Sequence, residues 1–406
     1  MGQLGMSEKP AGGMPAVAGA CLALFWSGSL AFALPGVMGP YWQQAFQVGR
    51  GAVGGTLFMM LAGVGCFMYL AGRWQLALGI PQAITLGSIL CALAMFLSAF
   101  AQGLGYIYAW AFLVGISQSF VYVPALTTAQ LWYPQRRGLV SGLVSLVFAG
   151  SAAVMSPVFA WFLEHAGYLA TNLAIAGATL VCGVVGARFT APPAGSALDR
   201  GAPAAEDDTA SVGRTLRSSS FWMLWGTVAL MGAGGIAMVT LGTSYGLSLG
   251  LDLGRAVVIL TVFNLGSGLS RLIMGYASDH LPRARVMSLA FFSAGVAYLL
   301  LPWAGEGWGL GPVVLLAGVI GYAFGTMWAV AAPLVTDCFG PRHFGEVFGL
   351  LFTAYGFISG ALGPSLGGFL ADWLGSFFWV FFYLVGLCLV AGLLITRVRP
   401  LADRGA

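Results

Sequence analysis

Long apolar stretches, separated by short polar segments, occupy most of the 406-residue chain. A helix needs roughly 20 mostly apolar residues to cross a hydrocarbon core about 30 Å thick. Twelve stretches of suitable length follow one another, near residues 15–37, 52–72, 79–100, 104–131, 138–163, 167–189, 220–245, 254–278, 284–304, 308–335, 345–370 and 376–396. The pattern predicts an all-α membrane protein with twelve transmembrane helices in a lipid bilayer.

A polar segment, residues 191–218, divides these stretches into six and six. It contains two adjacent prolines and the acidic run Glu206–Asp208, a composition typical of a linker between folded units. We therefore expect an N-terminal six-helix bundle over residues 1–190, a cytoplasmic linker over 191–218 and a C-terminal six-helix bundle over 219–406.

The two halves repeat several residues at one fixed offset. The matching pairs are Pro134 with Pro341, Gly138 with Gly345, Gly142 with Gly349, Leu143 with Leu350, and Pro157 with Pro364. Many alternating-access carriers are built from two related halves, with the substrate site between them near the bilayer midplane. The repeat therefore favours a secondary transporter over a receptor or an intramembrane enzyme.

Charged residues make up only 7% of the chain, whereas soluble domains carry about 25%. The net charge of +4 does not indicate a nucleic-acid partner, because the charges lie between the apolar stretches and form no basic patch. Loop Lys and Arg residues fall on one side of the membrane, except for Arg50 and Arg255. The positive-inside rule then predicts that both termini are cytoplasmic. Short loops and the preference for Arg over Lys suggest a bacterial inner membrane.

The segment from Gly275 to Arg285 resembles the G-x-x-x-D-x-x-x-R-x-R cytoplasmic loop signature of the major facilitator superfamily, with Asp279 as the acid and Arg283 as the first base. The resemblance implies the major facilitator fold, in which the two six-helix bundles are pseudo-symmetric. It also implies a gating role for Asp279, Arg283 and Arg285. These residues would hold neighbouring helix ends together by charge-assisted bonds in one state and release them in the other.

The equivalent loop of the first half lacks this chemistry. It keeps Gly72 and Gly79 but has Leu76 and Ala77 where the signature has an acid and a base. A symmetric latch is therefore not expected.

Two further segments give a narrower likeness. Trp132–Leu139 leads into the fifth span, and His343–Leu350 leads into the eleventh, which also contains Gly363 and Pro364. Together with Arg271 in the eighth span, these segments resemble the group of monocarboxylate transporters and oxalate:formate antiporters. The resemblance covers nearly all of the chain and implies a small carboxylate anion as the transported partner.

Arg271 is the one charged residue well inside an apolar stretch. An arginine at the bilayer centre costs at least about 2.5–3.5 kcal/mol, and its guanidinium group cannot avoid this cost by deprotonating. No Asp, Glu or His lies inside a span to pair with it. Because a guanidinium group matches a carboxylate bidentately, Arg271 is a candidate substrate-binding residue. The alternative is an arginine satisfied by carbonyl and hydroxyl groups.

Five other polar residues inside spans are candidates for the same site: Tyr355, Tyr122, Gln118, Tyr322 and Asn264. Gln118 and Tyr122 share a helix face, and Asn264 lies two turns before Arg271. The resemblance places a second positive residue, a lysine, in the eleventh span of oxalate:formate antiporters, where this chain has Tyr355. One positive charge balances one carboxylate, so we expect a monocarboxylate such as lactate, pyruvate or acetate. For each of the five residues, packing between helices is the alternative role.

The sequence leaves the energy source open. Proton-driven carriers usually have an Asp, Glu or His inside the membrane, and this chain has Ser267 where many monocarboxylate transporters have an aspartate. The proton could travel on or beside the substrate carboxylate at Arg271, or an acid at a span end such as Asp252 or Asp337 could titrate. A third route is anion exchange of the oxalate:formate type without protons. We favour proton symport.

Other function classes need features that the sequence lacks. An enzyme inside the membrane needs a nucleophile with a base, paired carboxylates or a metal cluster within the spans, and the spans contain none of these. The chain has no Walker loop, so ATP is not expected to drive it. We expect no metal, no other cofactor and no obligate protein partner. A non-transporting membrane sensor is the alternative from a different class, but neither terminus has room for a signalling domain.

Overall fold

A computed structural model describes residues 13–48, 50–196, 198, 212–251 and 253–399. The regular elements of this described part are all helices. Those of the first half are α1 (Gly13–Phe32), α2 (Leu34–Phe46), α3 (Arg50–Leu78), α4 (Ile80–Ser98), α5 (Leu104–Trp132), the short 3-10 helix η1 (Pro134–Arg136) and α6 (Arg137–Ala187).

The second half begins with a five-residue helix inside the predicted linker and continues with longer helices. Its α-helices are α7 (Val212–Leu216), α8 (Ser219–Ser248), α9 (Leu253–Ala277), α10 (Arg283–Trp303), α11 (Leu310–Phe339), α12 (Phe344–Thr353), α13 (Leu366–Leu374) and α14 (Phe377–Ile395). Three π-helical segments interrupt them: η2 (Ala304–Trp308), η3 (Ala354–Ser359) and η4 (Ala361–Ser365).

The described residues contain 11 helical segments that are long and apolar enough to cross a membrane. One of them, Pro134–Ala187, has 54 residues, about twice the length that one crossing needs. Gly167 interrupts this segment with φ +78°, a backbone conformation that glycine adopts without a steric penalty. The long segment therefore folds back as two spans, and the prediction of an all-α protein with twelve transmembrane helices is confirmed.

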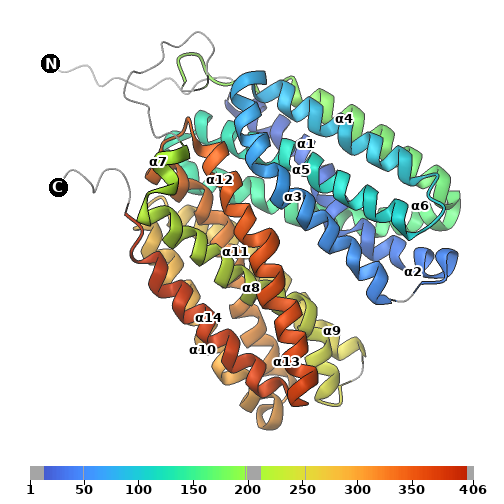
Figure 1. Cartoon of the computed structure of the whole chain (residues 1–406), viewed down its shortest axis with the longest axis vertical. Coiled ribbons are helices and arrows are strands. Elements are labelled where there is room, and N and C mark those ends of the chain that lie inside the picture. Colours follow the sequence, from blue (N-terminus) through green and yellow to red (C-terminus); the bar gives the residue numbers. More distant parts are fainter. Residues whose placement is uncertain (1–12, 49, 197, 199–211, 252, 400–406) are drawn as a thin grey trace.

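The helices pack into two groups, coloured blue to green and yellow to red in Figure 1. In the first group α1 packs against α6, and α3 and α4 pack against α5. In the second group α9 packs against α11, and α10 packs against α14. We call these groups the N-terminal bundle (α1–α6) and the C-terminal bundle (α8–α14). Helices within a bundle approach closely where glycines face each other, as Gly19 of α1 and Gly186 of α6 do.

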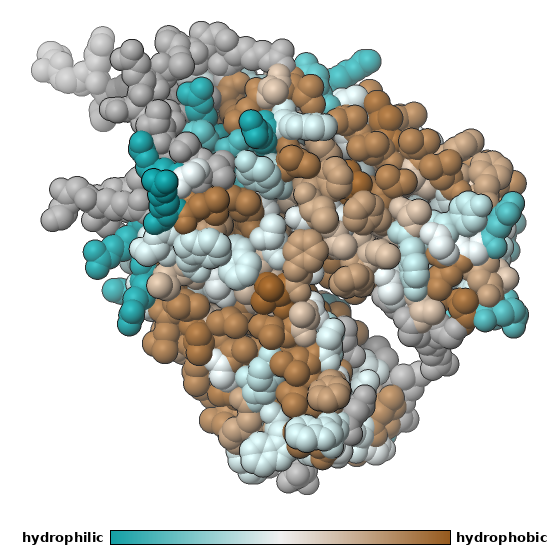
Figure 2. Space-filling view, in the orientation of Figure 1, coloured by the Kyte–Doolittle hydropathy of each residue, from teal (hydrophilic) through white to brown (hydrophobic). Residues whose placement is uncertain are grey.

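The most extensive contacts between the bundles are those of α3 with α12 and of α6 with α9. Both contacts are built from facing glycines, Gly72 with Gly345 in the first pair and Gly138 with Gly275 in the second. Both contacts lie near helix ends at one end of the molecule, where α7 also contacts α12. We call this the closed end. At the opposite end, which we call the open end, the bundles diverge (Figure 1) and Figure 2 shows a hollow between them.

Candidate substrate-binding site

Arg271 lies on α9 at the interface between the bundles and is 7% exposed. One of its terminal nitrogens, Nη1, donates a long hydrogen bond of 3.4 Å to the carbonyl oxygen of Ser145 on α6. Its Nε atom is buried and has no hydrogen-bond partner. Among the described residues, no carboxylate lies within 4.0 Å of this guanidinium group. Among the described residues, Arg271 is thus a buried cation with one long hydrogen bond, to Ser145.

Glycines on α6 and α9 explain how these two helices come so close together. A Cβ atom on Gly142 would collide with the carbonyl oxygen of Arg271, and a Cβ atom on Gly138 would collide with that of Gly275. Only glycine permits this approach of two backbones. The α6–α9 contact therefore fixes Arg271 between the bundles rather than in lipid.

Tyr122 and Tyr355 approach Arg271 from opposite bundles. The hydroxyl group of Tyr122 on α5 forms a 3.2 Å hydrogen bond with the hydroxyl group of Ser145. Tyr355 lies in the π-helical segment η3, and the phenol groups of both tyrosines lie near the guanidinium group of Arg271. Two of the predicted site residues are therefore brought to Arg271. Ser145 joins them through its carbonyl and its hydroxyl, and no pattern in the sequence distinguishes it from other serines in spans.

Aromatic rings surround this group of polar atoms and connect the bundles. Tyr122 lies 4.9 Å from Phe148 of α6 and 6.0 Å from Phe352 of α12, measured between ring centroids. Tyr355 lies 4.6 Å from Trp328 of α11. We call Tyr122, Phe148, Phe348, Phe352, Tyr355 and Trp328 the aromatic cluster. Such a cluster excludes water and strengthens any electrostatic contact made with Arg271.

The other three predicted site residues are not joined to Arg271 by any hydrogen bond found within the described part of the chain. Gln118 is buried in the N-terminal bundle, where its amide nitrogen approaches the carbonyl oxygen of Ser27 at 3.4 Å and the sulfur of Met60 at 3.5 Å. Tyr322 on α11 is half-buried, and Asn264 on α9 is exposed. Gln118 shares a helix face with Tyr122, as predicted, but its side chain is held by its own bundle.

The predicted gating residues Asp279 and Arg283 lie at the closed end and form part of an ionic network. Asp279 accepts hydrogen bonds of 2.7 Å and 2.9 Å from the backbone N–H groups of Gly138 and Leu139, at the start of α6. Arg283 lies 3.4 Å from Asp279 and donates a 2.6 Å hydrogen bond from Nε to Asp337 on α11. The loop of the C-terminal bundle thus holds the first turn of a helix from the N-terminal bundle.

Two further residues complete this network, and one predicted residue stands apart from it. Arg137 of α6 forms a 3.3 Å ion pair with Asp337. We call Arg137, Asp279, Arg283 and Asp337 the latch. Arg285 is exposed and takes part in none of the ion pairs found among the described residues. The sequence predicts Asp337 only as an acid that could titrate, and it predicts no role for Arg137. Arg137 directly precedes Gly138, one of the residues repeated between the two halves.

The pseudo-equivalent contact, α3 with α12, has no ion pair between the bundles in the described ranges. Glu346 in the first turn of α12 lies 3.4 Å from His343 of the same bundle. On the α3 side, Gln75 is buried beside Gly345 and accepts a 3.3 Å hydrogen bond from Thr127. Because Leu76 and Ala77 stand where the signature has an acid and a base, the described contact between α3 and α12 contains no ion pair between the bundles.

The profile of the Major Facilitator Superfamily matches residues 18–260 and 248–406. The chain is 28% identical over 275 residues to the oxalate:formate antiporter of Oxalobacter formigenes, covering 66% of this chain and 64% of the antiporter. It is 29% identical over 325 residues to monocarboxylate transporter 11 of Mus musculus, covering 76% of this chain and 69% of that transporter. The chain thus spans about two thirds of the length of these relatives.

Solved structures share the fold at low sequence identity. A structure of the fucose transporter FucP in the outward conformation superposes with a TM-score of 0.73 at 17% identity, covering 94% of this chain and 98% of that one. A structure of the proton:xylose symporter XylE bound to 6-bromo-6-deoxy-D-glucose gives a TM-score of 0.72 at 13% identity and covers 97% of each chain.

Proposed function

This chain belongs to the Major Facilitator Superfamily, and on that basis we propose that it carries small monocarboxylates, such as lactate, pyruvate or acetate, by proton-coupled symport. It is an integral membrane transporter of the group that contains monocarboxylate transporters and oxalate:formate antiporters. Its substrate and its coupling ion are the proposed parts.

The unpaired guanidinium group of Arg271 carries this proposal. It is buried between the bundles, its Nε atom has no partner, and no acid among the described residues neutralises it. A carboxylate would supply both the missing charge and a bidentate pair of acceptors. Substrate binding would therefore remove a large part of the cost of burying this cation.

The number of charges at the site favours one carboxylate over two. Arg271 is the cation of the site, and the residue that faces it from the eleventh span is Tyr355, which is neutral. The hydroxyl groups of Tyr355 and Tyr122 can donate to a carboxylate oxygen without adding charge. A dicarboxylate would keep one negative charge uncompensated among aromatic rings, so it should bind less well.

The two ends of the molecule support alternating access. The latch holds the closed end, while the bundles are separated at the open end (Figure 2). In our proposal both termini and the latch face the cytoplasm, as the distribution of Lys and Arg indicates, and the membrane is a bacterial inner membrane. Substrate then enters from outside, the open end closes around it, and the latch separates to release it.

Among the described residues, no acid lies beside Arg271 to carry a proton. Ser267, one turn before it on α9, cannot carry a proton in the physiological range, and no His or carboxylate pairs with the guanidinium group in the described residues. We therefore infer that the proton travels on or beside the substrate carboxylate. Asp337 is less suited to this role because it is held between Arg137 and Arg283.

Anion exchange of the oxalate:formate type is the second candidate. Its support is the 28% identity to the antiporter of Oxalobacter formigenes. An exchanger would use the same arginine but would return with a second anion instead of returning empty. Exchange therefore requires an anion on the opposite side of the membrane, whereas symport does not.

Uptake by purified protein in liposomes separates the two. Labelled lactate or formate is offered outside, either with an imposed inward proton gradient and an empty lumen or with oxalate inside and no gradient. We expect uptake that depends on the proton gradient and needs no internal anion. Uptake only against internal oxalate would establish exchange, and uptake in neither case would exclude both.

A further inference from the structure

Two consecutive residues of α11, Thr336 and Asp337, contact the N-terminal bundle at the closed end. Asp337 forms the 3.3 Å ion pair with Arg137 of α6. The hydroxyl group of Thr336 donates a hydrogen bond to the side-chain oxygen of Gln130 on α5. Arg137 and Gln130 therefore lie beside the same turn of α11. We call these two residues of the N-terminal bundle the inner pair.

Each side chain of the inner pair keeps a buried N–H donor that has no partner among the described residues. These donors are Nε of Arg137 and Nε2 of Gln130, a residue that is only 4% exposed. A buried donor without an acceptor lowers stability, because it has lost its contact with water and gained none in return. Two such donors in one place indicate a site that lacks its acceptor in this state of the protein.

Asp337 indicates which class of acceptor fits the inner pair. Its carboxylate lies against Arg137 of the N-terminal bundle and against Arg283 of its own bundle. When the bundles separate at this end, Asp337 leaves with the C-terminal bundle, whereas Arg137 and Gln130 stay on the N-terminal bundle. Separation would therefore leave a guanidinium group facing a vacated carboxylate position, with an amide donor beside it.

The inner pair lies between Arg271 and the closed end. Arg137 is eight residues before Ser145 on α6, whose carbonyl oxygen accepts the hydrogen bond from Arg271. Gln130 is eight residues after Tyr122 on α5, whose phenol group lies near Arg271. At 1.5 Å per residue, each member of the pair lies about 12 Å closer to the closed end than the Arg271 site does. A carboxylate that leaves Arg271 toward this end would therefore pass the inner pair.

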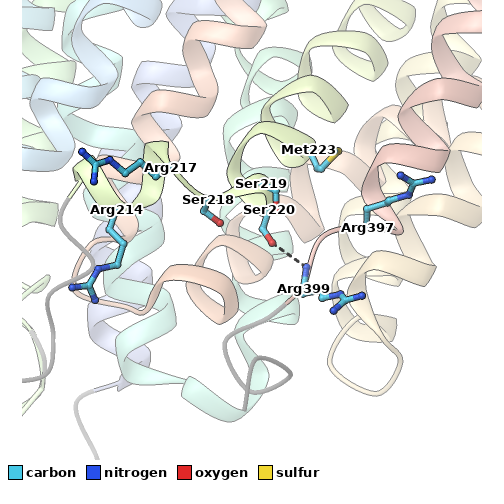
Figure 3. Close-up of a pocket in the computed structure, with 8 residues that line it drawn as sticks. All are labelled: Arg214, Arg217, Ser218, Ser219, Ser220, Met223, Arg397 and Arg399. Atoms are coloured by element: carbon cyan, nitrogen blue, oxygen red, sulfur yellow. Dashed lines mark hydrogen bonds between the residues drawn. The ribbon is translucent and has the colours of Figure 1, made fainter. Parts of the chain in front are cut away.

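Another group of arginines at the closed end has a different geometry. Arg214, Arg217, Arg397 and Arg399 line a cavity of about 590 Å³ beside the first turn of α8. Figure 3 shows the guanidinium groups of Arg214 and Arg217 extending away from those of Arg397 and Arg399. These side chains do not point toward one shared anion, whereas the arginines of the latch meet at one carboxylate.

We propose that Arg137 and Gln130 form a second carboxylate-binding site, which the transported monocarboxylate occupies after it leaves Arg271 and before it reaches the cytoplasm. The identity of this ligand rests on the function proposed above. Arg137 would supply the positive charge, and the amide of Gln130 would donate to a carboxylate oxygen. In the closed state Asp337 takes the place of the substrate. Its return after transport would displace the substrate, so closure of the latch would promote release.

Equilibrium binding of labelled lactate to the purified full-length protein tests the inner site directly. Arg271→Gln removes the first site, and Asp337→Ala removes the carboxylate that occupies the second. This double variant should still bind lactate, and adding Arg137→Gln should weaken that binding at least about 10-fold through loss of a charge-assisted bond. Adding Arg136→Gln, an exposed neighbour, should leave it unchanged.

Three results of this binding experiment would overturn the inner site. They are no lactate binding by the double variant, equal binding after Arg137→Gln is added, and competition by chloride as strong as that by acetate. Because Arg271 is absent from every protein compared, these results do not depend on its role. Failure of the proposed function would appear separately, as a lack of uptake by the unmodified protein or as normal uptake by Arg271→Gln.

Gln130→Leu tests the site while the ion pairs of the latch remain intact. In liposomes with one protein orientation, it should raise KM for lactate offered on the cytoplasmic side at least about 10-fold, because a donor to a carboxylate is lost. KM on the opposite side should stay unchanged. The matched control is Gln75→Leu, which removes another buried amide with an unpartnered Nε2 atom, at the contact with Gly345. An unchanged KM for Gln130→Leu, an equal rise on both sides, or the same rise for Gln75→Leu would overturn the proposal.

Discussion

Arg137 of α6 and Asp337 of α11 form an ion pair across the two bundles, with 3.3 Å between Nη1 and Oδ1. Asp337 also accepts the 2.6 Å hydrogen bond from Arg283 of its own bundle. One carboxylate therefore joins an arginine from each bundle at the closed end. Because these side chains are partly shielded from water, the pair contributes more than an exposed surface pair would.

Asp337→Asn should loosen the closed end. The variant loses the charge that holds Arg137 and Arg283 together, and losing a charged hydrogen-bond partner costs on the order of 1.5–3 kcal/mol, or about 10- to 100-fold in the open population. A cysteine at Ser141, which is buried on α6 one turn after Arg137, reports on this opening. In a background without the native cysteines, a water-soluble maleimide should label Ser141→Cys at least about 10-fold faster when Asp337 is Asn.

Arg285→Gln is the matched control for Asp337→Asn. Arg285 is exposed and shares the loop signature with Arg283, but it makes no ion pair among the described residues. Labelling of Ser141→Cys should be unchanged by this substitution. Equal labelling of the parent and the Asp337→Asn protein would mean that the latch does not hold the closed end.

Arg271→Gln should abolish uptake of the carboxylate while the protein still folds. Glutamine keeps a polar side chain but removes the charge that balances the anion, and Arg271→Lys should recover little because an ammonium group lacks the planar fork. Uptake in liposomes and the unfolding temperature are measured together. Arg255→Gln, an exposed position on the same helix, should transport normally. Near-normal uptake by Arg271→Gln would remove Arg271 from the site.

Hydropathy and the single embedded charge reveal much of this molecule before its structure is known. The twelve spans follow from apolar length, and the break between the fifth and sixth falls at Gly167, where the predicted stretch begins. Arg271 stands out because a span cannot easily bury a charge. The partners of these residues are less predictable. Ser145 acts partly through its backbone carbonyl, and every residue has one of those.

The residues of the latch are also only partly predictable from the sequence. Asp279 and Arg283 are found through a local signature, whereas Arg137 and Asp337 are far apart in the sequence and meet only because the bundles close. Gln118 shows why a shared helix face is insufficient. It lies four residues from Tyr122, yet its side chain turns to the Ser27 carbonyl oxygen within its own bundle. Helical spacing fixes the direction of a Cα–Cβ bond but not the rotamer or its partner.

Tyr355→Lys should shift the preference from monocarboxylates toward oxalate. The substitution adds a second cation opposite Arg271, which balances a second carboxylate. Competition by oxalate against labelled lactate or formate uptake measures the shift, with a gain of at least about 10-fold in relative affinity expected for one added charge contact. Tyr355→Phe keeps the ring contact with Trp328 and should not raise oxalate affinity. If lysine gave no shift, counting charges would not explain substrate choice.

Gly142→Ala should disrupt the contact between α6 and α9. A Cβ atom there would collide with the carbonyl oxygen of Arg271, whereas a Cβ atom at Gly177, on the second part of α6, would meet nothing within 4 Å. Overpacking typically costs about 1–3 kcal/mol, and Gly→Ala at an open helical site gains up to about 1 kcal/mol. Thermal unfolding of the two variants should therefore move in opposite directions. A Gly142→Ala protein as stable as Gly177→Ala would contradict the close backbone approach.

Tyr122→Phe should weaken substrate binding without unfolding the protein. The substitution keeps the ring against Phe148 and Phe352 but removes the hydroxyl group that bonds to Ser145 beside Arg271. A neutral hydrogen bond contributes about 0.5–1.5 kcal/mol, so KM for the carboxylate should rise about 2- to 10-fold with little change in maximal rate. The control is Tyr298→Phe, whose hydroxyl group donates a 2.7 Å hydrogen bond to Gly234 inside the C-terminal bundle. That variant should lose stability and keep its KM, so the reverse pattern would exclude Tyr122 from the site.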